Sequence, residues 1–176
     1  MGRAYLLTGR PGAGKTTCLL AALDLLGVPA GGFVTEEMRE RGTRVGFALR
    51  TLDGRRATLA HVNRTGPPRV GKYGVDVDAL ERVGVPAIRA AVREGRLVVI
   101  DEIGKMEMAS GAFRQAVEEV LRSQATLLGT ILTASHPWAD RIKGDRAVRL
   151  IEVTPANREA LPRELASLFT ARSEAP

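Results

Sequence analysis

Two separated stretches of the sequence contain the residue types that bind and attack a polyphosphate. The first, residues 9–16, reads GRPGAGKT and matches the pattern G-x-x-x-x-G-K-[ST]. Its glycines allow consecutive backbone N–H groups to turn toward a phosphate, and a helix that begins near Lys15 adds the positive end of its dipole. We expect Lys15 to reach the β and γ phosphates and the Thr16 hydroxyl to hold Mg²⁺. The phosphate-binding residues predicted in this loop are Gly9, Arg10 (through its backbone only), Pro11, Gly12, Ala13, Gly14, Lys15 and Thr16.

The second stretch, residues 97–108, reads LVVIDEIGKMEM and places two acids after four aliphatic residues. Such an aliphatic run predicts a buried strand over residues 97–100. Asp101, at the tip of this strand, is expected to orient the water shell of Mg²⁺. Glu102 is expected to take a proton from a water in line with the γ phosphate, or to polarise that water. The adjacent acids predict a hydrolase, because nucleotide kinases usually leave the attacking hydroxyl to an acceptor substrate.

The elements that must position these stretches alternate between strand and helix. The phosphate-loop pattern lies between a predicted strand and a predicted helix that Gly27 and Pro29 end, which is the context that the pattern requires. Ser110 is a candidate N-cap, and Thr154 and Pro155 are candidates for the start of the last helix, which Pro162 is expected to break or kink. We predict strands over residues 5–8, 97–100, 126–135 and 147–153, and helices over 15–26, 78–83, 86–94, a segment after 110, 136–143 and 157–172. This alternation predicts an α/β fold with a mostly parallel sheet in a single domain over residues 1–176.

Residues 31–62 depart from the alternation. They contain three strand-like runs, separated by turn signals at Arg41-Gly42 and Asp53-Gly54. We therefore expect an inserted antiparallel region there, followed by a loop rich in glycine and proline.

Composition narrows the classes of protein. The net charge is +6, and 22 of the 26 basic residues are arginine, without a dense cluster, so nucleic acid is a possible partner that the pattern does not favour. The single cysteine, Cys18, cannot form an intrachain disulfide and is expected to be a small buried residue. No apolar run reaches membrane-spanning length, which predicts a cytoplasmic protein with no membrane partner.

Five segments together resemble a known family. TGRPGAGKTT, GGFVTEEMRERGTRVGF, RVGKYGVD, VVIDEIGKMEM and EVTPANRE occur in the same order as in the small P-loop nucleoside-triphosphatases of thermophilic archaea and bacteria, a family that includes the human cancer-related nucleoside triphosphatase. The resemblance covers nearly the whole chain. It implies a Mg²⁺-dependent phosphohydrolase that acts on ATP, GTP, CTP and UTP, with a three-layer P-loop NTPase core related to recombinase-type ATPases.

The resemblance also implies which residues contact nucleotide. The first segment extends the phosphate loop to Thr17, and the second comprises Leu97, Val98, Val99, Ile100, Asp101, Glu102, Ile103 and Gly104. Lys105 is a further catalytic candidate, because its charge can offset the charge that develops on the γ phosphate; the alternative is a solvated lysine at the start of a helix. The catalytic residues predicted are therefore Lys15, Glu102 and Lys105, and the metal ligands Thr16 and Asp101.

For several other polar residues the sequence is consistent with two different roles. Glu36 and Glu37 either line the nucleotide cleft or form a solvated strand face, His136 is either a loop residue or a catalytic one, and Arg141 with Lys143 either covers the nucleotide or belongs to a basic surface. Two other functions stay open beside hydrolysis: a small-molecule kinase, which needs an acceptor pocket, and a nucleotide-switched module that binds RNA or protein. A monomer is expected, because no apolar stripe is left over.

Overall fold

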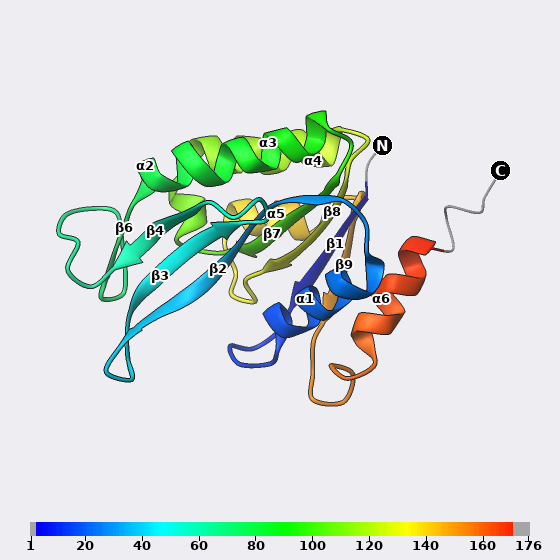
Figure 1. Ribbon diagram of the computed structural model, residues 1–176, viewed down its shortest axis with the longest axis horizontal. Coiled ribbons are helices and arrows are strands. Elements are labelled where there is room, and N and C mark those ends of the chain that lie inside the picture. Colours follow the sequence, from blue (N-terminus) through cyan, green and yellow to red (C-terminus); the bar gives the residue numbers. More distant parts are fainter. Residues whose placement is uncertain (1–2, 171–176) are drawn as a thin grey trace.

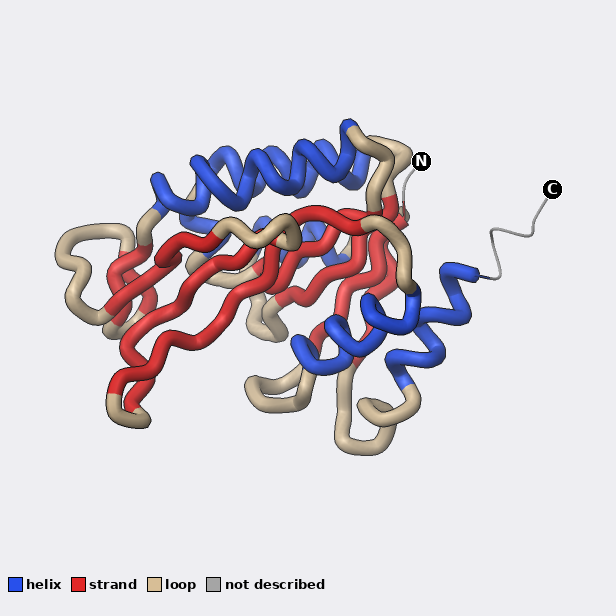
Figure 2. Tube along the Cα trace, viewed as in Figure 1, coloured by secondary structure: helices blue, strands red, loops and turns tan. Residues whose placement is uncertain are grey.

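The computed structural model describes residues 3–170, which form one nine-stranded sheet with helices on both faces (Figures 1 and 2). The sheet order is β5-β6-β4-β3-β2-β7-β8-β1-β9. The strands are β1 (Arg3–Thr8), β2 (Ala30–Glu40), β3 (Thr43–Thr51), β4 (Arg56–His61), β5 (Arg69–Val70), β6 (Tyr73–Val75), β7 (Leu97–Ile103), β8 (Thr126–Ile131) and β9 (Val148–Glu152). The helices are α1 (Lys15–Leu26), α2 (Val77–Ala79), η1 (Leu80–Gly84), α3 (Val85–Arg93), η2 (Glu107–Ala109), α4 (Gly111–Arg122), α5 (Pro137–Lys143) and α6 (Leu161–Thr170).

Two apolar cores lie on opposite faces of the sheet. Helices α2, α3 and α4 run along one face, where Phe33, Ile100 and Phe113 are fully buried, and α1 and α6 lie on the other, where Leu7 and Leu19 are fully buried (Figure 1). The central strands β1, β7 and β8 pair in parallel and carry runs of buried residues, as strands covered on both faces do. The prediction of a mixed α/β fold is confirmed, but the sheet that was predicted to be mostly parallel has four parallel and four antiparallel strand pairs within the described residues.

The parallel strands bring the two candidate stretches together. The carboxyl ends of β1 and β7 lie at the same edge of the sheet, with only β8 between them. The phosphate loop follows β1, and the two acids lie near the end of β7. The strand predicted over residues 97–100 is longer in the structure, because β7 continues to Ile103. The pairing of β7 with β8 is interrupted after Ile100 and resumes where Ile103 pairs with Ile131.

The antiparallel region is larger than the three strands expected. The first half of β2 pairs in parallel with β7, and its second half pairs with β3, which pairs in turn with β4. The following segment was predicted to be a loop, yet it contains β5 and β6, of two and three residues. These strands are too short to show alternation, but β6 extends the sheet by pairing with β4.

Several helix predictions need correction. The two helices predicted over 78–94 form one continuous helical segment, because a π-turn at η1 joins α2 to α3. The last helix begins at Leu161 rather than at residue 157, and Pro162 lies in its first turn, where the missing N–H has no helical partner to lose. Thr154 is not an N-cap: its N–H donates to Asn157 Oδ1, which fixes a turn ahead of the helix. The predicted end of this helix, residues 171–172, lies outside the described residues.

Other predictions are confirmed. Ser110 caps α4 by accepting a hydrogen bond from the N–H of Phe113, and Cys18 is a buried free thiol.

The strand predicted over 126–135 is shorter in the structure, because β8 ends at Ile131 and a loop follows it. Between residues 3 and 170, no helix combines the length and apolar character needed to cross a membrane.

Candidate active site

The start of the phosphate loop packs closely against the segment that follows β9. Gly9 has a φ of +147°, and a Cβ on this residue would lie 2.7 Å from the carbonyl oxygen of Val153, so only glycine fits. Lys15 Nζ donates a hydrogen bond of 2.8 Å to the carbonyl oxygen of Gly9, and its side chain is 13% exposed. The ammonium group of Lys15 therefore lies against its own phosphate loop. We expect it to leave the Gly9 carbonyl and contact the phosphate when a nucleotide binds.

Thr16 and Asp101 meet directly. The Thr16 hydroxyl donates to Asp101 Oδ2 at 2.9 Å, and the Thr130 hydroxyl donates to the other carboxylate oxygen. Burial raises the pKa of Asp101, while these two hydrogen bonds and the charge of Lys15 oppose the shift. A hydroxyl and one carboxylate at the edge of a phosphate loop form the small oxygen donor set that Mg²⁺ uses together with substrate phosphates. The residues fit Mg²⁺, and within residues 3–170 no cluster of three or more acidic, histidine or cysteine side chains offers a site made of protein alone.

Glu102 faces the phosphate loop from the end of β7. Its Oε2 lies 3.9 Å from Lys15 Nζ, and its side chain is 34% exposed. Burial raises the pKa of this carboxyl, Lys15 lowers it, and the neighbouring Asp101 raises it. A carboxylate in reach of both the phosphate-binding lysine and solvent can accept a proton from a water near the γ phosphate.

A third carboxyl, Glu107, lies in the same cavity and was not predicted. A Cβ on Gly104 would lie 2.6 Å from Glu102 Oε1 and 3.0 Å from Glu107 Oε2, so both carboxyls approach the same point and Gly104 leaves the space between them. Burial raises the pKa of Glu107 to about 8, and the charges of Glu102 and Asp101 add to the shift. At neutral pH Glu107 is therefore protonated, which avoids a third negative charge beside the phosphate site.

Glu107→Gln is expected to remove a pH dependence of stability. The pKa of Glu107 is about 8 in the folded protein against 4.5 ordinarily, so the unfolded chain loses the proton first, and stability from this group falls as pH rises from 4.5 to about 8. The loss is on the order of 3 kcal/mol at pH 7. Urea unfolding at pH 5 and pH 8 measures it: the difference between the two pH values should shrink in Glu107→Gln. The control Glu159→Gln, at a side chain that is 92% exposed, should leave the difference unchanged. Equal pH dependence in wild type and Glu107→Gln would contradict this assignment.

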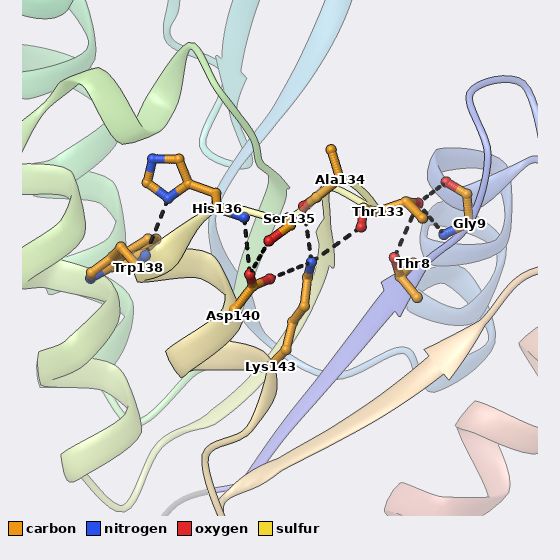
Figure 3. Close-up of polar contacts among 9 residues, drawn as sticks. All are labelled: Thr8, Gly9, Thr133, Ala134, Ser135, His136, Trp138, Asp140 and Lys143. Atoms are coloured by element: carbon orange, nitrogen blue, oxygen red, sulfur yellow. Dashed lines mark hydrogen bonds and ion pairs between the residues drawn. The ribbon is translucent and has the colours of Figure 1, made fainter.

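A cluster of polar residues in the loop after β8 and in α5 contacts the start of the phosphate loop at Gly9 (Figure 3). Thr133 Oγ1 donates to the carbonyl oxygen of Gly9 at 2.6 Å and accepts from its N–H at 3.2 Å. Lys143 Nζ reaches back from α5 to donate to the carbonyl oxygens of Thr133 and Ala134 and to Asp140 Oδ1. Lys143 thus fixes the loop that carries Thr133, rather than lying free to cover a nucleotide.

Thr133→Val is expected to raise the KM for ATP by about five- to tenfold, the effect of one hydrogen bond of ~1 kcal/mol. The carbonyl oxygen of Gly9 accepts hydrogen bonds from the Thr133 hydroxyl and from Lys15 Nζ. When Lys15 turns to a phosphate, the Thr133 hydroxyl remains as the side-chain donor to this buried carbonyl. Thr133→Ser keeps the hydroxyl and should restore the wild-type KM. Steady-state kinetics on the three proteins measures this, and a wild-type KM in Thr133→Val would show that the bond does not support binding.

The remaining predicted residues divide into those that line the cavity and those that support it. The cavity has a volume of about 700 Å³, and every residue from Gly9 to Thr17 except Arg10 lines it, as do Asp101, Glu102 and Lys105. Lys105 is exposed. The side chains from Leu97 to Ile100 and of Ile103 are buried in the two cores, so they position the acids and do not face the cavity.

The uncertain polar residues take ordinary structural roles, with one exception. Glu36 pairs with Arg50 and Arg56 away from the cavity. His136 caps α5 by accepting from the N–H of Trp138, and Arg141 is exposed on that helix. Glu37 is the exception: it lines the cavity while pairing with two arginines.

Glu107 and Thr133 carry weak sequence signals. Glu107 lies in the same stretch as the two acids, and only its burial beside Gly104 distinguishes it from a surface glutamate. Thr133 follows a buried strand that neighbours β1, and this adjacency depends on the strand order.

Comparison with known proteins identifies the family of this chain. A family model described as NTPase matches residues 4–166. The chain is 46% identical to nucleoside-triphosphatase THEP1 of Thermotoga petrophila, over 91% of this chain and 89% of that protein. It is 42% identical to the cancer-related nucleoside-triphosphatase of Homo sapiens, over 92% and 93% of the two chains. The crystal structure of THEP1 from Aquifex aeolicus superimposes with a TM-score of 0.86 at 34% identity, covering 94% of this chain and 98% of that one.

The family model covers both candidate stretches and nearly all of the described sheet. The relatives match almost from end to end, so the likeness is not limited to a phosphate loop. The chain belongs to the NTPase family.

Proposed function

We propose that this protein hydrolyses nucleoside 5′-triphosphates to the diphosphate and phosphate, with Mg²⁺ and with little preference for the base. The observation that carries the proposal is the meeting of Lys15, Thr16, Asp101 and Glu102 in one cavity at the carboxyl ends of β1 and β7. Relatives named nucleoside-triphosphatases support the same activity for this chain. The position of β8 between the phosphate-loop strand and the acid-bearing strand supports a core related to recombinase-type ATPases.

Each residue has one task in the proposed reaction. Backbone N–H groups of the loop and Lys15 bind the β and γ phosphates, and Glu102 accepts a proton from the attacking water. Thr16 and Asp101 would hold Mg²⁺, which when bound neutralises charge on the phosphate oxygens. The bond from water oxygen to the γ phosphorus forms as the bond to the bridging oxygen breaks.

Broad base specificity follows from where the recognition lies. Backbone groups and a lysine contact phosphates, which are the same in every nucleotide. A second cavity of about 700 Å³ opens beside the loop, between α1 and α6, and is lined by Gly12, Thr17 and Arg158 among others. We assign the ribose and base to this open cavity. Release of phosphate from ATP, GTP, CTP and UTP with Mg²⁺ and no added acceptor tests the proposal: turnover of all four supports it, and turnover of none overturns it.

Lys105→Ala is expected to slow hydrolysis by about tenfold, because Lys105 lines the cavity beside Glu102 and can offset charge on the γ phosphate. Initial rates at saturating ATP measure this. The control is Lys72→Ala, because Lys72 is an exposed lysine outside the cavity. Lys143 is unsuitable as a control because it donates a hydrogen bond to the loop that carries Thr133. A rate for Lys105→Ala within about threefold of wild type, below ~1 kcal/mol, would remove Lys105 from the mechanism.

A further inference from the structure

The cavity continues past Glu102, away from the phosphate loop. In the sheet, β1 carries the loop, β7 carries Glu102, and β2, β3, β4, β6 and β5 follow in that order. Val34 pairs with Asp101, and Thr35, the next residue of β2, lines the same cavity as Glu102. The lining of the same cavity then includes Phe47 of β3, Leu59 of β4 and Val70 of β5. Glu102 therefore lies between two parts of one cavity.

The far part is apolar. We call it the apolar compartment, formed by Phe47, Leu59, Val70 and Met106. The Phe47 ring packs edge-on against Tyr73, with centroids 5.2 Å apart, and the guanidinium of Arg44 lies 5.3 Å from its centre. These contacts hold a half-buried aromatic ring at the wall of an open cavity, as in sites that bind small organic molecules.

The charges around the apolar compartment are largely neutralised. Glu37 lines the cavity, but Arg39 and Arg44 pair with it at 2.7 and 2.9 Å. Burial raises the pKa of Glu107 to about 8, which favours the neutral form of this carboxyl at pH 7. Apart from Lys105, which the proposed reaction uses at the γ phosphate, the lining beyond Glu102 offers apolar surface and hydrogen-bonding groups, without the cationic cluster that a second phosphorylated ligand requires.

The proposed nucleotide does not need this compartment. Its phosphates lie at the loop on β1, and the cavity between α1 and α6 receives the base and ribose on that side of the loop. The apolar compartment lies on the other side of Glu102, where the nucleophile must approach the γ phosphate. A molecule bound there would place its own atoms where the attacking water lies.

We propose that the apolar compartment binds the hydrocarbon body of a small uncharged alcohol, whose hydroxyl replaces water as acceptor of the γ phosphoryl group. This inference rests on the proposed function, because both reactions use the same nucleotide and the same Glu102. The alcohol oxygen forms a bond to the γ phosphorus, and the bond from that phosphorus to the bridging oxygen breaks with its electron pair passing to the nucleoside diphosphate. The hydroxyl proton passes to Glu102. The products are a phosphate monoester and the nucleoside diphosphate, and hydrolysis is the reaction that remains without an alcohol.

The experiment compares 2-phenylethanol with ethanol at equal concentration, in the presence of ATP and Mg²⁺, and resolves the products by ³¹P NMR. The apolar compartment should favour the aromatic alcohol, so the ratio of monoester to inorganic phosphate should be at least about tenfold higher for 2-phenylethanol, as expected when ~1.4 kcal/mol of binding separates them. Saturation-transfer NMR with a nonhydrolysable ATP analogue should also show contact between the ring of 2-phenylethanol and the protein.

Two variants locate the effect. Phe47→Ala removes a wall of the compartment, and Val70→Trp fills it; both should abolish the monoester and the NMR contact while phosphate release from ATP alone stays within about twofold of wild type. The matched control is Phe169→Ala, which removes a half-buried ring that stacks on Tyr5 outside the cavity and should leave the monoester unchanged. Thermal melting confirms that each variant is folded.

Several results would overturn the inference. They are inorganic phosphate as sole product, equal ratios for the two alcohols, or a monoester that persists in both Phe47→Ala and Val70→Trp. Failure of hydrolysis itself is distinguishable, because it appears as no phosphate release from ATP in the absence of any alcohol.

Discussion

Replacing Glu102 with glutamine is expected to lower phosphate release from ATP by about 10²–10⁴-fold while the affinity for the nucleotide stays within about threefold. Glutamine keeps the size of the side chain but cannot accept the proton of the attacking water. The phosphate contacts come from the loop and Lys15, so binding survives. Stopped-flow phosphate release and equilibrium binding of a fluorescent ATP analogue measure the two quantities separately.

The matched control for Glu102→Gln is Glu36→Gln. Glu36 is a partly buried glutamate that pairs with Arg50 outside the cavity, so its replacement should leave turnover near wild type. Retained turnover in Glu102→Gln would show that a group other than Glu102 accepts the proton.

Lys15→Ala is expected to lose both binding and turnover, with kcat/KM reduced by about 10²–10³-fold or more, equivalent to ~3–4 kcal/mol of transition-state stabilisation. Lys15 is the lysine of the phosphate loop: its Nζ donates to the Gly9 carbonyl oxygen and lies 3.9 Å from Glu102 Oε2. The change also leaves Glu102 without its ion-pair partner. Lys72→Ala, at an exposed lysine above the Tyr73 ring, provides the control and should keep full activity. Turnover of Lys15→Ala within tenfold of wild type would mean that the loop binds phosphate through its backbone alone.

The phosphate loop and its flanking elements were predictable because their signals are local. Gly9, Gly14, Lys15 and Thr16 lie within the short stretch of residues 9–16, and the helix that begins there shows regular apolar spacing. The buried strand before Asp101 was predictable for the same reason. Both stretches belong to one site because parallel strands end at one edge of a sheet.

Other features depend on tertiary contacts, which no local pattern contains. The pKa of Glu107 is raised because the folded chain buries this side chain beside Gly104. Thr133 reaches Gly9 only because β8 lies beside β1. The apolar compartment combines side chains from four separate segments, so Phe47 and Val70 look like ordinary core residues in the sequence. The start of the last helix was misplaced because Asn157 uses its side chain to fix a turn, where a helix-start pattern was expected.

The most direct test of the central claim is one turnover of ATP by the wild-type protein in H₂¹⁸O with Mg²⁺ and no alcohol, followed by mass spectrometry of both products. Attack of water on the γ phosphorus, assisted by Glu102, predicts one ¹⁸O atom in each released phosphate and none in the diphosphate. Label in the diphosphate, or no phosphate released until an acceptor is added, would contradict the assignment of this site to nucleoside-triphosphate hydrolysis.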